Sequence, residues 1–146
     1  VPHESELRMR VEPYLFFNGC CDEVIALYQD AFGASLLARM FYKEVPDTLP
    51  VPLPLGWGDK VLHASLRIGE TTVMASDGLT TDPPHFEDFS LSMEMPDEQA
   101  ARRAFDALAP GGQVQMPIGP TFFSPCFGMV VDRFGVSWMI TIPNPA

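Results

Sequence analysis

The chain has 146 residues and 47% of them are hydrophobic, which is enough for one domain with a buried core. Its formal net charge of −10 argues against binding to nucleic acid or to an anionic membrane surface, since both attract clustered Lys and Arg. No apolar run is long enough to span a membrane, and three Cys without paired spacing indicate neither a disulfide framework nor a structural zinc site, which favours a reducing cytoplasm.

The first half of the chain predicts a βαβββ unit. Residues 1–10 are polar and mixed in charge, which is typical of a loosely held tail and not of a signal peptide. Alternating apolar residues over 11–18 predict a strand, and helical spacing over 21–32 predicts a helix that Gly33 ends. The segments expected after it are a strand over 36–45, a Pro- and Gly-rich loop over 46–59, and hairpin strands over 61–68 and 71–76.

The second half predicts the same order of elements after a linker over residues 78–88. Asp97 is suited to cap the N-terminus of a helix that runs to Leu108, and Pro110-Gly111-Gly112 ends that helix. The strands expected around the helix cover residues 89–95, 114–118, 126–131 and 137–142.

The two halves are therefore interpreted as copies of one unit, the first over residues 11–77 and the second over residues 89–142. Both helices are amphipathic, so each covers one face of a sheet and leaves the other face free. We expect a single α+β domain over residues 11–142, in which two paired βαβββ modules form one curled mixed sheet around a cleft. Such a cleft is suited to binding a small organic molecule.

Two polar residues are candidates for contact with a ligand. His63 lies in the middle of a predicted strand and is the best candidate for a catalytic residue, because imidazole titrates near neutral pH. The alternative for His63 is a partly buried side chain that bonds a neighbouring strand or loop. Asp77 follows the strand over 71–76, where its carboxylate either binds a polar group of the ligand or caps the following turn.

Aromatic and thioether side chains at or near strand positions are candidates for an apolar binding surface. The candidates are Tyr14, Phe122, Phe123, Trp138 and Met139. Alternation along the last strand places Trp138 and Met139 on opposite faces, one toward the helices and one toward the cleft, and leaves open which is which. For each candidate the alternative is a place in the hydrophobic core.

Other notable side chains have structural interpretations. Cys20 and Cys21 lie where the first helix begins, a position that can activate a thiol, but no His and Asp partners stand beside them in the sequence. We therefore expect structural thiols, at Cys126 as well. Trp57 either anchors its loop or contacts a second subunit, and Asp132 is expected in turn hydrogen bonds or an ion pair before the last hairpin.

Several motifs occur in an order that resembles a known family. The motifs are Pro13-Tyr14-Leu15-Phe16-Phe17-Asn18-Gly19, Lys60 to Gly69, Met74-Ala75-Ser76-Asp77 and Phe127 to Ile140. Together they resemble the PhnB-like proteins, a branch of the vicinal oxygen chelate superfamily with glyoxalase, bleomycin-resistance and extradiol dioxygenase relatives. The resemblance covers residues 11–142 and implies paired βαβββ modules in a homodimer.

The resemblance also bears on a metal site. Relatives that depend on metal bind a divalent ion through side chains of the first and last strands of each module. The corresponding positions here are Glu12, Val73 or Met74, Phe89 or Ser90, and Met139. Only Glu12 is a good ligand, so we expect no metal and no other cofactor. In the alternative, one divalent ion is bound by Glu12, His63, Asp77 and Glu94.

Four functions follow as hypotheses. The preferred one is metal-free binding of a small organic molecule in the cleft by a cytoplasmic homodimer. The alternatives are a metal-dependent lyase, isomerase or dioxygenase, a metal-free enzyme with His63 as general base beside Asp77 or Glu12, and a dimer whose cleft is vestigial. The methyltransferase label common among PhnB-like proteins is not supported, because Asn18-Gly19-Cys20-Cys21 is no Gly-rich loop for a methyl donor.

Overall fold

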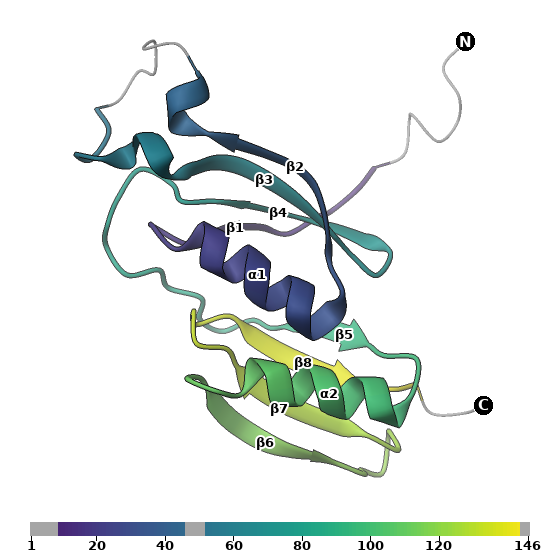
Figure 1. The fold of residues 1–146 in the computed structure, drawn as a ribbon. Helices are drawn as coiled ribbons and strands as arrows, with labels where there is room; N and C mark the ends of the chain where they lie inside the picture. Colours follow the sequence, from purple (N-terminus) through teal and green to yellow (C-terminus); the bar gives the residue numbers. More distant parts are fainter. Residues whose placement is uncertain (1–8, 46–51, 144–146) are drawn as a thin grey trace, which may run out of the picture.

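The computed structural model describes residues 9–45 and 52–143, which form the βαβββ order of elements twice (Figure 1). Residues 1–8 of the predicted tail over 1–10, and residues 46–51 of the predicted loop, lie outside the described residues. The first module consists of β1 (Tyr14–Phe16), α1 (Cys21–Phe32), β2 (Ser35–Phe41), β3 (Val61–Ile68) and β4 (Thr71–Ser76), with short 3₁₀ helices η2 (Tyr42–Glu44) and η3 (Trp57–Asp59) between β2 and β3. The second module consists of β5 (Leu91–Glu94), α2 (Glu98–Leu108), β6 (Gln113–Gly119), β7 (Phe127–Val131) and β8 (Ser137–Thr141).

Local signals explain where the elements begin and end. Gly33 adopts a left-handed conformation with φ of 65° and ends α1, as predicted. Asp97 accepts a hydrogen bond from the amide of Ala100 and caps α2, also as predicted. The first strand is shorter than expected, because Pro13 has no N–H to donate and the positive φ of Asn18 and Gly19 turns the chain toward α1.

The α+β fold class with two paired βαβββ modules is confirmed, but the strands form two four-stranded sheets where one curled sheet was expected. Sheet A has the order β1-β4-β3-β2 and sheet B the order β5-β8-β7-β6. In each sheet the first strand of the module is parallel to the last one, with Tyr14 opposite Met74 and Leu91 opposite Trp138. Residues of both sheets, including Pro13 and Leu91, line a small hollow of about 110 Å³ at the junction between them.

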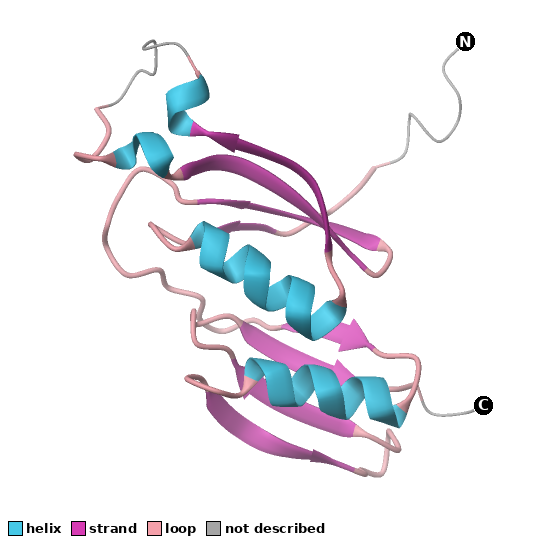
Figure 2. Cartoon of the chain, in the orientation of Figure 1, coloured by secondary structure: helices cyan, strands magenta, loops and turns pink. Residues whose placement is uncertain are grey.

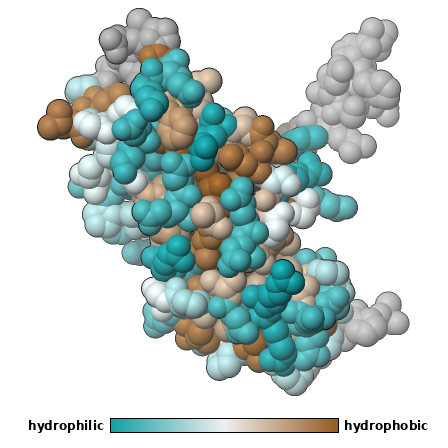
Figure 3. Space-filling view, viewed as in Figure 1, coloured by the Kyte–Doolittle hydropathy of each residue, from teal (hydrophilic) through white to brown (hydrophobic). Residues whose placement is uncertain are grey.

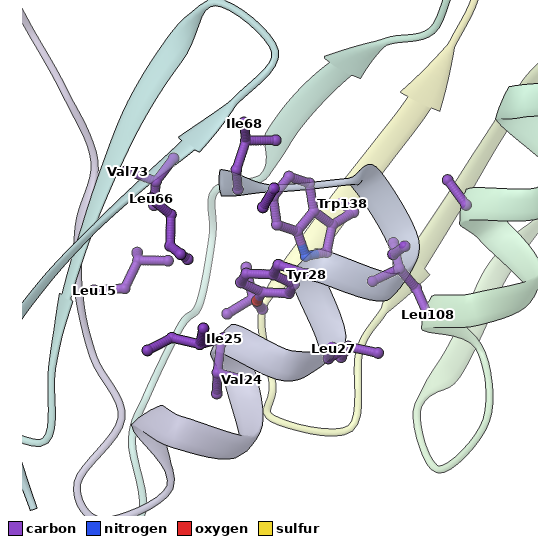
Figure 4. Packing of buried hydrophobic residues seen from close by; sticks show 14 of the residues in the cluster. Leu15, Val24, Ile25, Leu27, Tyr28, Leu66, Ile68, Val73, Leu108 and Trp138 are labelled. Atoms are coloured by element: carbon purple, nitrogen blue, oxygen red, sulfur yellow. The ribbon is translucent and has the colours of Figure 1, made fainter. Parts of the chain in front are cut away.

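The two helices pack against each other, α1 on sheet A and α2 on sheet B; in the view of Figure 2, α1 lies below the strands of sheet A and α2 in front of those of sheet B. Apolar side chains of α1 meet those of both modules in one continuous core (Figure 4). Tyr28 and Trp138 lie at its centre, with ring centroids 5.2 Å apart in an edge-on arrangement. Each sheet is left with a face that no helix of the described chain covers, which we call its open face.

A buried carboxylate links the modules through this core. The hydroxyl of Tyr28 on α1 donates to Oδ2 of Asp132 at 2.6 Å, and the indole Nε1 of Trp138 donates to the same oxygen at 3.1 Å. Oδ1 of Asp132 accepts from the amides of Phe134 and Val136, which confirms the expected turn hydrogen bonds. Asp132 is 2% exposed, so these four donors replace its water. Burial and the adjacent Asp132 raise the pKa of Tyr28 well above its usual value.

We predict that Tyr28→Phe lowers the free energy of unfolding by about 1–3 kcal/mol, because it removes one donor from a buried carboxylate. Tyr14→Phe, which removes a hydroxyl from a partly exposed ring, is the matched control and should cost less. Chemical denaturation of the variants measures both values. Equal losses in the two variants would contradict the assigned role of Tyr28.

The hydroxyl of Tyr28 also makes the stability of the unaltered protein depend on pH, and Tyr28→Phe removes this dependence. The unfolded Tyr loses its proton near pH 10, whereas folded Tyr28 keeps it to higher pH. Its contribution to stability is therefore present below pH 10 and is lost as the pH rises through the folded value. The stability of Tyr28→Phe should fall less steeply above about pH 10 than that of the unaltered protein.

Candidate functional site

The open face of sheet A carries exposed aromatic and thioether side chains. Leu15 points toward α1 and is buried, whereas its neighbours Tyr14 and Phe16 are 38% and 52% exposed. Across the sheet from them lie Met74 on β4 and His63 on β3. Strand alternation therefore places an apolar surface on the face that the helix leaves free.

A chain of three polar groups crosses this face. The hydroxyl of Tyr14 lies 2.9 Å from Nδ1 of His63, and Nε2 of His63 lies 3.2 Å from the hydroxyl of Ser65. Partial burial raises the pKa of Tyr14, so its phenol stays protonated at neutral pH. The rings of Tyr14 and Phe16 are stacked with centroids 5.0 Å apart. Two predicted ligand residues, Tyr14 and His63, thus lie in direct contact, and both nitrogens of His63 have partners.

Sheet B resolves the two alternatives along its last strand. Trp138 faces α1 and α2, is 3% exposed and belongs to the core. Met139 lies on the open face, opposite Met129 on β7 and Ser92 on β5. Trp138 is therefore not on the surface where we place the candidate site. Strand alternation alone could not predict this assignment, because it shows that Trp138 and Met139 lie on opposite faces but not which face packs against the helices.

Phe123 lies apart from the Tyr14–His63 pair, in the loop between β6 and β7. It is 45% exposed, and its ring contacts that of Phe127 edge-on with centroids 4.9 Å apart. Neighbouring Phe122 is 96% exposed. The role of Phe123 as a ligand residue stays a prediction.

Two adjoining hollows follow the open faces and the linker between the modules. The first, which we call the aromatic slot, has a volume of about 410 Å³ and is walled by Tyr14 and Phe16 of β1 and by Phe86 and Phe89 of the linker, which in the structure runs over residues 77–90 between β4 and β5. The second, of about 720 Å³, is lined by Met139 of β8 and by linker residues, and we call it the acidic hollow. Phe86 and Phe89 line both hollows, so the two are neighbours. The part played by these two linker rings was not predicted.

The linker is held in place by two contacts. The ring of Phe86 packs on buried Phe17 with centroids 5.4 Å apart. The side-chain amide of Asn18 donates to the carbonyl oxygen of Asp82 at 2.7 Å. The linker wall of the slot is therefore fixed on the first module. Figure 3 shows the side of the molecule on which both helices are visible, where hydrophilic side chains surround smaller hydrophobic areas.

Asp77 has a structural role. Its Oδ1 accepts from the amides of Gly19 and Cys21 at 2.9 and 2.8 Å, and its Oδ2 accepts from the amide of Val61 at 2.8 Å. The carboxylate is 1% exposed and lies at the N-terminus of α1, where the helix dipole favours a negative charge. Asp77 thus caps α1, whose own N-cap residue Cys20 makes no side-chain cap. Apart from ligand binding, the role predicted for Asp77 was to cap the turn that follows it. The helix that Asp77 caps instead begins at Cys21, 56 residues earlier in the chain.

The positions that bind metal in relatives do not offer a suitable set of ligands. Glu12 is the one carboxylate among them, beside the thioethers of Met74 and Met139 and the hydroxyl of Ser90, which bonds Ser137 at 2.7 Å. Thioethers are poor ligands for hard or borderline cations. Within residues 9–45 and 52–143, no three His, Cys, Asp or Glu side chains are grouped so that they could hold an ion. The alternative set of Glu12, His63, Asp77 and Glu94 is therefore not assembled.

The remaining sequence candidates are structural. Burial raises the pKa of Cys20, Cys21 and Cys126, which disfavours the reactive thiolate. Trp57 is 4% exposed and its Nε1 donates to the carbonyl oxygen of Gly78 at 2.8 Å, so it anchors its loop within the same chain. Among the described residues, no helix has the length and apolar character needed to cross a membrane.

Comparison with known proteins agrees with this architecture. Protein YjdN of Escherichia coli (strain K12) is 34% identical over 140 residues, which cover 92% of this chain and 95% of YjdN. The crystal structure of protein PA1353 from Pseudomonas aeruginosa is 39% identical, has a TM-score of 0.81 and covers 94% of this chain and 100% of its own. A PhnB protein from Bacillus cereus, at 24% identity, has the same fold with a TM-score of 0.75 and covers 92% of this chain and 99% of its own.

The same overall fold occurs in a glyoxalase-related enzyme from Fulvimarina pelagi and in the fosfomycin resistance protein FosX from Listeria monocytogenes, with TM-scores of 0.60 and 0.61. The chain itself belongs to the PhnB-like family, whose sequence model, described as 3-demethylubiquinone-9 3-methyltransferase, matches residues 9–141.

We predict that Asp77→Asn destabilises the protein by about 3 kcal/mol. The side-chain NH₂ of Asn replaces one carboxylate oxygen of Asp77, so that at least one buried backbone amide loses its charged acceptor and faces another donor. Asp59→Asn, at an exposed carboxylate that pairs with Lys43, is the control and should change stability little. Thermal or chemical unfolding of both variants measures the difference. An unchanged melting temperature for Asp77→Asn would show that the carboxylate does not cap α1.

Proposed function

We propose that this protein binds a small, largely apolar organic molecule on the open faces of its sheets, without a resident metal ion, as a cytoplasmic homodimer. The observation that carries the proposal is the exposure of Tyr14, Phe16 and Phe89 within a concave slot. Large rings that stay exposed in a hollow mark a surface that something else covers. The slot and the acidic hollow, at about 410 and 720 Å³, fall in the range of small-molecule sites.

The polar groups on the open faces suit them to orienting a ligand. The Tyr14–His63–Ser65 chain can reverse its direction with the tautomer of His63, so that it offers either a free donor or a free acceptor at each end. A few such groups in an apolar site give a ligand its orientation. Binding needs nothing further from these residues, which is why we favour it over catalysis.

Methyl transfer, the activity in the family's description, finds no support at the turn after β1. Backbone amides at such a turn hold the phosphate or carboxylate groups of cofactors in other folds. Here the amides of Gly19 and Cys21 already donate to the buried carboxylate of Asp77. A cofactor would have to displace a charge that caps α1.

A thermal-shift screen of small metabolites should reveal compounds that raise the melting temperature, because a ligand that binds only the folded state stabilises it. Phe16→Ala should weaken binding of such a compound about ten-fold by removing a stacking partner. Leu55→Ala, at a fully exposed apolar residue, is the control and should bind as before. Binding should also survive EDTA, whereas stoichiometric divalent metal and loss of binding on chelation would support the metal-dependent alternative.

The edge strands support the dimer. β2 and β6 end their sheets and expose large apolar side chains, with Leu37 57% and Met116 41% accessible. Unpaired edges of this kind tend to be covered by another chain.

Light scattering on the protein as it elutes from a gel-filtration column should therefore give twice the 16.1 kDa of one chain. Leu37→Glu combined with Met116→Glu should shift the mass toward one chain, since two charges are placed in an apolar contact. A mass of 16.1 kDa for the unaltered protein at micromolar concentration would contradict the dimer.

A further inference from the structure

The residues that line the two hollows share a charge pattern. Three of them carry a carboxylate, Asp82 in the aromatic slot and Glu87 and Asp88 in the acidic hollow. None of the lining residues is Lys or Arg. Within the described chain, no Lys or Arg forms an ion pair with these three residues, and Glu87 lies 3.7 Å from Nδ1 of His85. The field in the hollows is therefore negative and adds to the net charge of −10.

The aromatic slot adds a second feature that favours positive charge. Rings of Tyr14, Phe16, Phe86 and Phe89 wall it from two sides. The face of an aromatic ring is electron-rich, so that a cation placed over it is attracted, and alkylated ammonium groups are bound in this way because their desolvation costs little. Pro83 and Pro84 complete the wall without offering an N–H donor to an anion.

We propose that the ligand of this site is an organic cation, with an alkylated ammonium group among the rings of the aromatic slot and its charge facing the linker carboxylates. The inference rests on the proposed function and specifies its ligand class. Phe86 and Asn18 hold the linker on the first module, so the slot is formed before the ligand arrives. The walls thus need little ordering on binding, which favours affinity.

A set of three probes tests the charge directly. 4-(Trimethylammonio)benzyl alcohol, its uncharged isostere 4-tert-butylbenzyl alcohol, and 4-tert-butylbenzoate have nearly the same shape and differ in charge. Isothermal titration calorimetry should show the cation binding at least about ten-fold more tightly than the neutral isostere at low salt, with the anion weakest. The preference should shrink as ionic strength rises.

Variants locate the preference. Phe89→Leu keeps an apolar side chain but removes a ring face, so the cation should lose several-fold in affinity while the neutral isostere changes little. Phe122→Leu, the same substitution at an exposed ring outside both hollows, should leave both affinities unchanged. Glu87→Gln combined with Asp88→Asn should weaken the cation alone, and Asn suits the positive φ of 63° at position 88.

The outcomes separate this inference from the proposed function. If the neutral or anionic probe binds as tightly as the cation or more tightly, the inference that the ligand is a cation is wrong. It is also wrong if none of the three probes binds while the metabolite screen yields a neutral or anionic ligand whose binding Phe16→Ala weakens. In both cases small-molecule binding itself would stand. If neither the probes nor any compound of the screen binds, both proposals fall.

Discussion

The buried carboxylate of Asp132 is the constraint on which the arrangement of this molecule depends. A carboxylate removed from water requires compensating donors, and here they come from three places: the turn between β7 and β8, the indole of Trp138 on β8, and the hydroxyl of Tyr28 on α1. Only the last belongs to the other module. Because the carboxylate is satisfied in full only when α1 lies against sheet B, the bond selects one way of packing the modules.

That packing decides which surfaces are left for function. Once α1 and α2 meet each other and the inner faces of their sheets, the helix sides are occupied by the common core. The opposite faces are the ones that remain open, and the linker crosses beside them with Phe86 tied to Phe17. The aromatic slot is therefore a consequence of how the core closes. Asp77 contributes on the same principle, since it fixes the entry to α1 and the start of β3 with one carboxylate.

Much of the fold could be predicted because its signals are local. β3 and β4 match their predicted bounds, since apolar and polar residues alternate over residues 62–68 and Gly69-Glu70 marks the turn between the two strands. The division into two sheets was not predictable, because no local pattern shows whether strands of different modules hydrogen-bond to each other. Of the residues predicted for the site, Tyr14, His63 and Met139 lie on the open faces, although the sequence left open which face of each strand meets the helices. Trp138 was placed in the core by its bond to Asp132, a contact that no pattern along one strand reveals.

The central claim is that the open faces, and not the helix-covered side, hold the ligand. A crystal structure of the protein with a compound that raises its melting temperature tests this most directly. We expect density for the compound between Tyr14, Phe16 and Phe89, extending toward Met139. Density between the ends of α1 and α2 on the other side, or a slot filled by side chains of a second copy, would contradict the account.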